Sequence, residues 1–278
     1  SYRDSDDWTA KTREVVEELG LGPKRISIEK DSWFITLRDF ERLSSALPST
    51  TFVDCSGLVE EGRMIKSPAE LDYMGQAARA AEAGLMAGVE ACAVGASEND
   101  VAAAIHDAQI RAGSEYTAMP PFITSGPRSA LGHATWYRQE LKAGDTVFLE
   151  IPGCVNRYHA ALMRNVFLGE PSGRMLEATE VVVRALEGMI GLITPGVTAH
   201  DAHDFCARTI AEAGLGVTMD HRAAYSIGIG FAPDWGEGQI ISINEGEHRP
   251  LQAGMTFHLI PFVNIPGLTS VGVSETVL

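Results

Sequence analysis

The sequence predicts an α/β fold whose main part is a duplicated α-α-β half. One pattern of helix start recurs after an offset of 101 residues, a long helix precedes each copy, and glycine-rich strand segments follow each copy. The 278 residues are enough for one large domain, or for a large domain and a small one. Hydrophobic residues make up 45% of the chain, so a sizeable core can form at this length.

Residues 1–62 are predicted to form a smaller α/β segment. Helical periodicity predicts helices at 8–19 and 36–46, and short apolar runs predict strands at 25–29 and 51–54. Two helices and two strands make a poor independent core. We therefore expect this segment to be part of a larger unit.

The main domain is predicted to cover residues 63–278. Its first long helix has a sharp start, because Ser67 is an N-cap, Pro68 takes the first helical position and Glu70 completes a capping box. This helix is expected to run to about residue 91. The start of the helix sets the predicted domain boundary.

The main domain contains the repeat. Gly95-Ala-Ser-x-x-Asp100 opens one helix, and Gly196-Val-Thr-x-x-Asp201 opens another at the same spacing. Long helices at 67–91 and 172–193 precede the two copies. We expect two halves related by a pseudo-twofold axis, with sheets inside, helices outside and a ligand cleft between the halves.

Charge and hydropathy exclude several partners. The formal net charge is −15, whereas phosphate binding needs clustered Lys and Arg, so we expect no nucleic-acid partner. No apolar run reaches the ~18 residues of a membrane span and no signal peptide opens the chain, so we expect no membrane partner and a cytoplasmic location. The chain begins with Ser and ends at Leu278 in a strand-like run, which favours trimming at one or both ends.

The cysteines indicate a reducing compartment. No C-x-x-C pair occurs, so a thiolate metal site is not expected and free buried thiols are. The four cysteines are Cys55, Cys92, Cys154 and Cys206.

Two residues have the chemistry of a catalytic site. The predicted strand 146–151 ends its apolar run at Glu150, and a carboxylate at the end of a buried strand is costly unless it is paired or used. His133 precedes this strand, and an imidazole titrates near neutrality, as a proton shuttle requires. If Glu150 is only part of a structural ion pair, Arg164 on the next predicted strand is the best candidate partner.

These segments resemble, in order along nearly the whole chain, the creatinase/aminopeptidase family with the pita-bread fold. Its ectoine-hydrolase-like branch looks closest. The resemblance implies that residues 1–62 are the C-terminal part of a creatinase-like N-terminal domain. The matching motifs are Lys66-Ser-Pro-Ala-Glu70, Glu150-Ile-x-Gly-Cys154, Arg157-Tyr-His159, Tyr158 through Arg164, Arg164-x-Val-Phe-Leu-Gly169, Pro233-Asp-Trp-Gly-Glu237, Ala253-Gly-Met-Thr-Phe257 and Gly254-Met-Thr-Phe-His258.

The sequence departs from the metallopeptidases of this family at their metal ligands. Those enzymes hold two ions with two Asp, one His and two Glu. The corresponding positions here are Glu150, Ala161, Tyr225, Ile260 and Glu275. Hard divalent ions need several oxygen or imidazole ligands, so no metal and no cofactor is expected.

Creatinase shows what the resemblance implies without metal. It cleaves a C–N bond with a His that shuttles a proton and Glu residues that grip a small charged substrate. Its base falls on His133 and its first site Glu on Glu150, whereas its second falls on Ile260. His258 is two residues earlier on the same predicted strand and is the candidate to take over part of that role.

We therefore predict a metal-independent hydrolase of a C–N bond in a small amide or cyclic amidine of the ectoine type. A small-molecule substrate and a second copy of the chain, in a homodimer, are the expected partners. The alternatives are a metal-dependent Xaa-Pro aminopeptidase or dipeptidase, an inactive ligand-binding member, and a lyase. Predicted catalytic residues are His133, Glu150 and Glu275, and predicted substrate-binding residues are Tyr158, His159, Tyr225, Trp235, Glu237 and His258.

Overall fold

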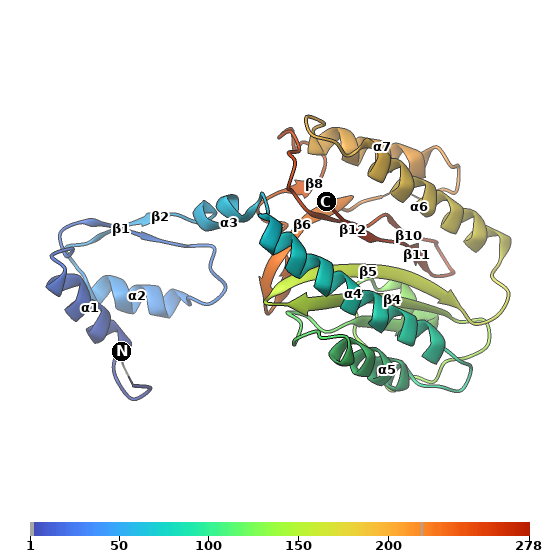
Figure 1. Ribbon diagram of the computed structural model, residues 1–278, viewed down its shortest axis with the longest axis horizontal. Coiled ribbons are helices and arrows are strands. Elements are labelled where there is room, and N and C mark those ends of the chain that lie inside the picture. The colour runs from blue at the N-terminus through green and yellow to red at the C-terminus, as the bar shows by residue number, and fades with distance from the viewer. Residues whose placement is uncertain (1–2, 218) are drawn as a thin grey trace. The chain divides into compact units, whose positions relative to one another are not determined.

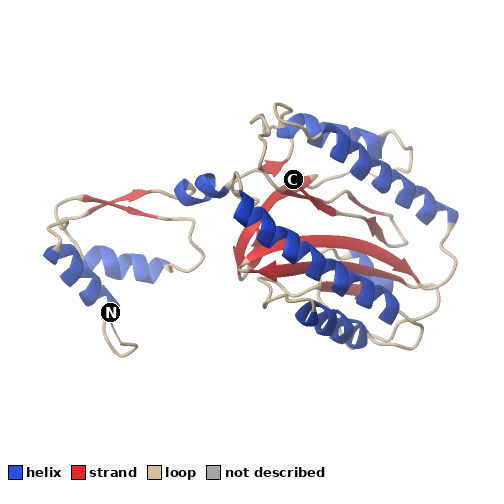
Figure 2. Ribbon diagram, in the orientation of Figure 1, coloured by secondary structure: helices blue, strands red, loops and turns tan. Residues whose placement is uncertain are grey.

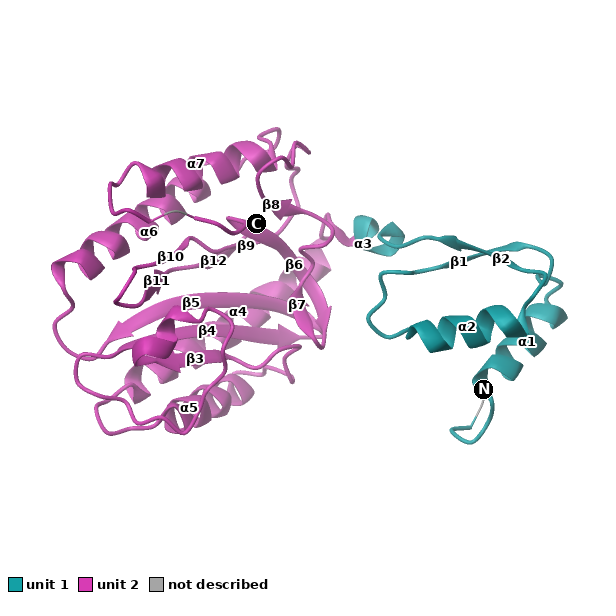
Figure 3. Cartoon of the chain, turned by 180° about the vertical axis from the view of Figure 1, so that it is seen from behind, with its two compact units in different colours: residues 1–62 teal, residues 63–278 magenta. Residues whose placement is uncertain are grey.

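A computed structural model describes residues 3–217 and 219–278. The chain divides into two compact units, one ending at Gly62 and the other beginning at Arg63 (Figure 3). No helix in the described ranges is both long and apolar enough to cross a membrane.

The first unit has a small core between two helices and a pair of parallel strands. Val16, Leu43 and Leu47 are its buried apolar residues. A final short helix was not predicted, because none of its six residues is buried and it therefore shows no apolar periodicity. The elements are α1 (Trp8–Glu18), β1 (Arg25–Ile28), α2 (Leu37–Ala46), β2 (Thr51–Asp54) and α3 (Leu58–Arg63).

The second unit is an antiparallel sheet with two pairs of helices against it (Figures 1 and 2). Its strands run in the order β12-β9-β6-β5-β4-β3, with β7 and β8 also paired to β6, while β10 and β11 form a separate ribbon. The helices are α4 (Pro68–Ala91), α5 (Glu98–Arg111), α6 (Gly173–Leu192) and α7 (Ala199–Ala211), with a short 3₁₀ helix η1 (Gly126–Ala130). The strands are β3 (Phe122–Ser125), β4 (Thr146–Val155), β5 (Tyr158–Phe167), β6 (Ala224–Phe231), β7 (Asp234–Gly236), β8 (Ser242–Ile243), β9 (Phe257–Leu259), β10 (Phe262–Asn264), β11 (Ser270–Gly272) and β12 (Glu275–Val277).

The two halves of this unit begin in the same way. Ser97 and Thr198 are N-caps, and each forms a capping box with the Asp three residues later. Each capped start is joined to a later loop by the same pair of backbone hydrogen bonds. These run from Gly95 N to Leu141 O and Leu141 N to Ala96 O, and from Gly196 N to Leu251 O and Leu251 N to Val197 O.

Helix α4 lies across β4 and β5 at very close range (Figure 1). A Cβ at Gly153 of β4 would lie 2.0 Å from the backbone oxygen of Ala77, so only glycine allows this approach. The contacting face of α4 consists mostly of small residues, including Ala80, Ala81 and Gly84. The backbone contact fixes the distance between α4 and β4, the strand that carries Glu150.

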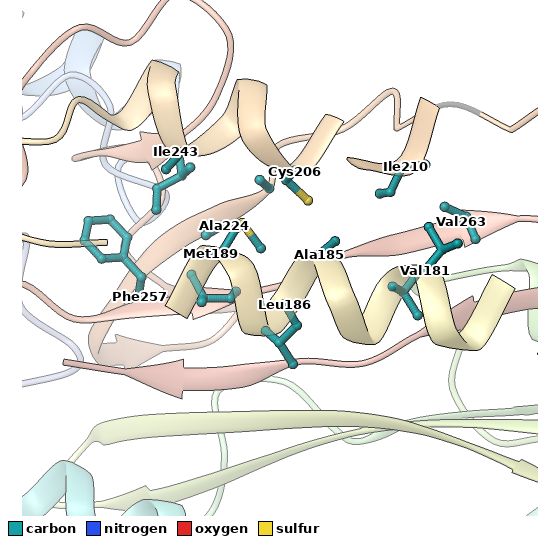
Figure 4. Packing of buried hydrophobic residues seen from close by; sticks show 14 of the residues in the cluster. Val181, Ala185, Leu186, Met189, Cys206, Ile210, Ala224, Ile243, Phe257 and Val263 are labelled. Atoms are coloured by element: carbon teal, nitrogen blue, oxygen red, sulfur yellow. The ribbon is translucent and has the colours of Figure 1, made fainter. Parts of the chain in front are cut away.

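The second half has its own apolar core between α6, α7 and the strands (Figure 4). Leu186 and Met189 of α6, Ile210 of α7 and Phe257 of β9 are buried in it. This core places β6 and β9 beside each other, with Tyr225 directly opposite His258.

Candidate active site

A cavity of about 320 Å³ opens on the second unit where the two halves meet. It brings together residues from β4, β5, β6, β10 and three connecting segments. Its lining residues are Gly132, His133, Phe148, Glu150, Met163, His221, Arg222, Tyr225, Ile260 and Phe262. Three predicted site residues, His133, Glu150 and Tyr225, therefore open onto one space.

Glu150 lies in an apolar row across the sheet. Phe122 of β3 and Met163 of β5 are its direct cross-strand partners, so all three side chains point to the same face. Its side chain accepts no hydrogen bond within residues 3–217 and 219–278, and its Oε1 lies 3.9 Å from Nδ1 of His258. Burial raises the pKa of Glu150 to about 8, against a smaller opposing effect of Arg222.

His133 reaches the cavity from the loop after η1. Its ring stacks on Phe122, with centroids 5.0 Å apart, and Phe122 is itself opposite Glu150. The side chain is exposed, but partial desolvation and the nearby Arg222 cation lower its pKa. A neutral imidazole at the mouth of the cavity can accept a proton.

Tyr225 belongs to a series of hydrogen-bonded side chains. Trp235 Nε1 donates to the Tyr225 hydroxyl at 2.7 Å, which in turn lies 2.8 Å from His258 Nδ1. His258 Nε2 is 2.6 Å from the Ser274 hydroxyl. Because an indole N–H can only donate, the Tyr225 oxygen accepts there and its own hydrogen is available to His258. Burial lowers the pKa of His258 to about 3, so this imidazole is neutral.

Trp235 and His258 were predicted to bind substrate, and the structure places them in the layer behind the cavity wall. Both are buried, at 1% and 0% exposure, and neither lines the cavity. They fix the position of Tyr225, which does line it. Of these three residues, Tyr225 is the one among the lining residues of the cavity.

Tyr158 and His159 were also predicted to bind substrate, but neither lines the cavity. The Tyr158 hydroxyl donates to Glu70 at 2.8 Å. His159 Nε2 accepts from the backbone of Ala118 at 3.1 Å, and Nδ1 faces the carbonyl of Arg157 at 2.9 Å. Both ring nitrogens are thus used by the backbone.

Glu237 also lies outside the lining of the cavity. Its carboxylate is 1% exposed, lies 2.8 Å from Lys66 Nζ and lies 3.4 Å from Arg63. A buried carboxylate between two cations is a structural anchor for the start of α4. Glu237, predicted to bind substrate, is thus not brought to the cavity with His133, Glu150 and Tyr225.

Glu275 lies on the opposite face of the sheet from Glu150. Thr276 is the cross-strand partner of His258, so the side chain one residue earlier points the other way. Glu275 instead pairs with Arg164, the residue expected to be the alternative partner of Glu150. The residue before it, Ser274, contacts His258 behind the cavity wall. Glu275, predicted to be catalytic, is therefore not among the residues that line this cavity.

Sequence reasoning missed two basic residues of the cavity, His221 and Arg222. His221 is held between the carbonyl oxygens of Arg222 and Phe262, at 2.7 and 3.0 Å. Arg222 lies over the Tyr225 ring. The available signal was an adjacent His-Arg pair immediately before the strand that carries Tyr225.

The donors around the cavity do not fit a divalent metal ion. In the part of the chain that the structure describes, no three His, Cys, Asp or Glu side chains are placed to hold one. Glu150 is the one carboxylate among the lining residues, and Ile260 offers no donor. The His221 nitrogens already face carbonyl oxygens.

Comparisons with known proteins place this geometry in a family. Residues 72–278 match the metallopeptidase family M24, and residues 1–65 match the creatinase/prolidase N-terminal domain. The ectoine hydrolase of Halomonas elongata is 30% identical over 273 residues, covering 92% of this chain and 65% of that protein. The Xaa-Pro dipeptidase of Pyrococcus furiosus is 25% identical over 268 residues, covering 96% of this chain and 74% of that protein.

The chain spans 61% of a hydrolase/peptidase of Sinorhizobium fredii that is 32% identical to it, and so under two thirds of that relative and of the ectoine hydrolase. The solved dipeptidase of Pyrococcus horikoshii superposes with a TM-score of 0.87 at 27% identity, covering 100% of this chain and 75% of that one. The chain therefore belongs to metallopeptidase family M24 and has the pita-bread fold of the prolidases.

Proposed function

We propose that this chain is the catalytic region of a metal-independent hydrolase that opens a C–N bond in a small amide or cyclic amidine of the ectoine type. The observation that carries the proposal is the lining of the cavity. It includes a desolvated Glu150 and His133, but not the set of donors that would hold a divalent metal ion. The ectoine hydrolase among the relatives supports the substrate class.

In the proposed reaction, water adds across the C=N bond of the amidine and the ring C–N bond breaks. The products are an amide and an amine within one open chain. Glu150 attacks or anchors the amidine carbon, and the cationic amidine pairs with its carboxylate form. His133 takes a proton from water and returns it to the leaving nitrogen. Tyr225, fixed by its hydrogen bonds with Trp235 and His258, forms part of the wall.

The experiment is turnover of ectoine, related amidines and Xaa-Pro dipeptides by the purified chain, with chelator and with added Mn²⁺. We expect ring opening of an amidine that chelator leaves unchanged, and loss of at least about 100-fold in Glu150→Gln and His133→Asn. Glu187→Gln, on the exposed face of α6, is the matched control. Mass spectrometry identifies the product, because a lyase leaves an alkene and a hydrolase adds water.

A second candidate, an Xaa-Pro dipeptidase, is favoured by the relatives of that name. Dipeptide cleavage that depends on Mn²⁺ and stops with chelator would establish it instead. No turnover of any compound would favour a ligand-binding role.

We also propose a homodimer in the cytoplasm. The family resemblance supports the dimer, and the four free cysteines support a reducing compartment. Light scattering of the purified chain measures the oligomeric state, and a monomer at micromolar concentration would exclude a stable dimer.

A further inference from the structure

The cavity lining includes one carboxyl group, which a bound cation would ionise, and one guanidinium. Glu150 stands on the sheet, and the Arg222 guanidinium stands on the segment before β6. Arg222 affects the pKa of two other residues of the cavity. It opposes the burial effect on the pKa of Glu150 and adds to the lowering of the pKa of His133. A ligand that satisfies both ends must itself carry two opposite charges.

The guanidinium of Arg222 is held in place before any ligand arrives. Its plane lies over the Tyr225 ring at 4.4 Å, and Nη1 donates to the Ser242 hydroxyl at 3.3 Å. A Cβ at Gly238 would lie 2.2 Å from Nη1, so the missing side chain there makes room for the cation. Three segments therefore shape one position for this group.

Arg222 nevertheless lacks an acidic partner of its own. Within residues 3–217 and 219–278, no carboxylate lies within ion-pair distance of its guanidinium. The chain has 37 acidic residues against 22 basic ones, so acids are abundant. A preplaced guanidinium that faces a cavity and is left without a carboxylate has its pairing site open to the ligand.

We propose that Arg222 binds the carboxylate of the substrate and so makes the site selective for amidines that carry an acid group. The amidine part of this statement rests on the proposed function. Arg222 is then the specificity-determining residue of the cavity, and Glu150 receives the cationic end of the same molecule.

The test is calorimetric binding of two probes, ectoine and the same cyclic amidine without its carboxylate. The wild-type chain should prefer ectoine by roughly 10- to 100-fold. Arg222→Gln should reduce this preference to less than about threefold. Gly238→Ala, which displaces the guanidinium and keeps its charge, should weaken ectoine binding alone.

The matched control is Arg208→Gln, the same chemical change on the exposed face of α7. Equal weakening of both probes by Arg222→Gln would show a structural role and overturn the proposal, as would equal affinity of the wild-type chain for the two probes. Melting temperatures of all variants separate unfolding from lost selectivity.

Failure of the proposed function has a different signature. If neither amidine binds the wild-type chain, the amidine assignment falls, and the comparison is repeated with Ala-Pro and Ala-Pro amide. A preference for the free carboxylate that Arg222→Gln removes would still establish the anchor. No preference, or no binding of any of the four compounds, overturns it.

Discussion

A carboxyl group placed between Phe122 and Met163 without a hydrogen-bond donor keeps its proton up to about pH 8. The unfolded chain releases the same proton near pH ~4.3. Folding therefore favours the protonated form, and the stability that it contributes is full below the unfolded pKa and is lost as pH rises through about 8. At alkaline pH the ionised Glu150 therefore lowers the free energy of unfolding.

Replacing Glu150 by Gln should consequently stabilise the protein at alkaline pH. The neutral amide has nearly the same shape and cannot ionise, so at pH 9 the melting temperature should rise by several degrees, on the order of a few kcal/mol. At pH 4 to 5 the difference should be small. Thermal unfolding followed by circular dichroism across this range checks it, and a destabilised Glu150→Gln at pH 9 would contradict it.

Ligand binding should release a proton for the same reason. A cationic amidine needs the carboxylate form of Glu150, which the free site holds mainly protonated at pH 7. Calorimetry with ectoine in buffers of different ionisation enthalpy should therefore report about one proton released at pH 7 and almost none at pH 9.5. A binding heat independent of the buffer at pH 7 would argue against a proton on Glu150.

The hydroxyl of Tyr225 is the central group of the series of hydrogen bonds that links Trp235, His258 and Ser274. Tyr225→Phe leaves the Trp235 N–H and one nitrogen of His258 without partners in a buried place, which should cost about 1–3 kcal/mol. Urea unfolding measures the loss. Tyr137→Phe, at a residue 67% exposed, is the control and should change stability by less than about 0.5 kcal/mol.

At the level of elements, local signals were sufficient for the four long helices of the second unit. Ser67, Ser97 and Thr198 form the capping boxes that the sequence indicated, because a capping box involves only residues within one turn. Short strands at the end of the chain were harder. Glu275 was assigned to the site from its correspondence to a metal-ligand position of the family, whereas in the structure Ser274 contacts His258 and Glu275 has the opposite orientation.

The contact of α4 with β4 is the element-scale feature most sensitive to substitution. Gly153→Ala puts a methyl group 2.0 Å from the Ala77 carbonyl, and backbone on both sides cannot yield cheaply. We expect a loss of at least about 2 kcal/mol, or failure to fold. Gly191→Ala in α6 meets no atom within 4 Å and should gain ~0.5–1 kcal/mol. Equal stabilities of the two variants in urea would refute the close contact.

For the whole molecule, the duplication places the cavity. Glu150 and Met163 come from the first half, and Tyr225 and Ile260 from the second. The repeat could be recognised from the sequence because each helix start is a local pattern. His133 and Glu150 could be singled out from their chemistry and from the resemblance to creatinase. Arg222 could not be recognised from the sequence, because the position of its guanidinium depends on Tyr225, Gly238 and Ser242. These residues come together only in the folded chain.

The donor set of the folded chain also predicts its response to metal ions. An ion that binds only the folded state at 100 times its dissociation constant stabilises a protein by about 2.7 kcal/mol, which is several degrees in melting temperature. Within the described ranges no cluster of three suitable side chains exists, so millimolar Mn²⁺ or Zn²⁺ should shift the melting temperature by less than about 1 °C. Chelator should have equally little effect on stability and on amidine turnover. A shift of several degrees that saturates with metal, together with two ions per chain by elemental analysis, would mean that the cavity binds metal and that Glu150 acts as a ligand.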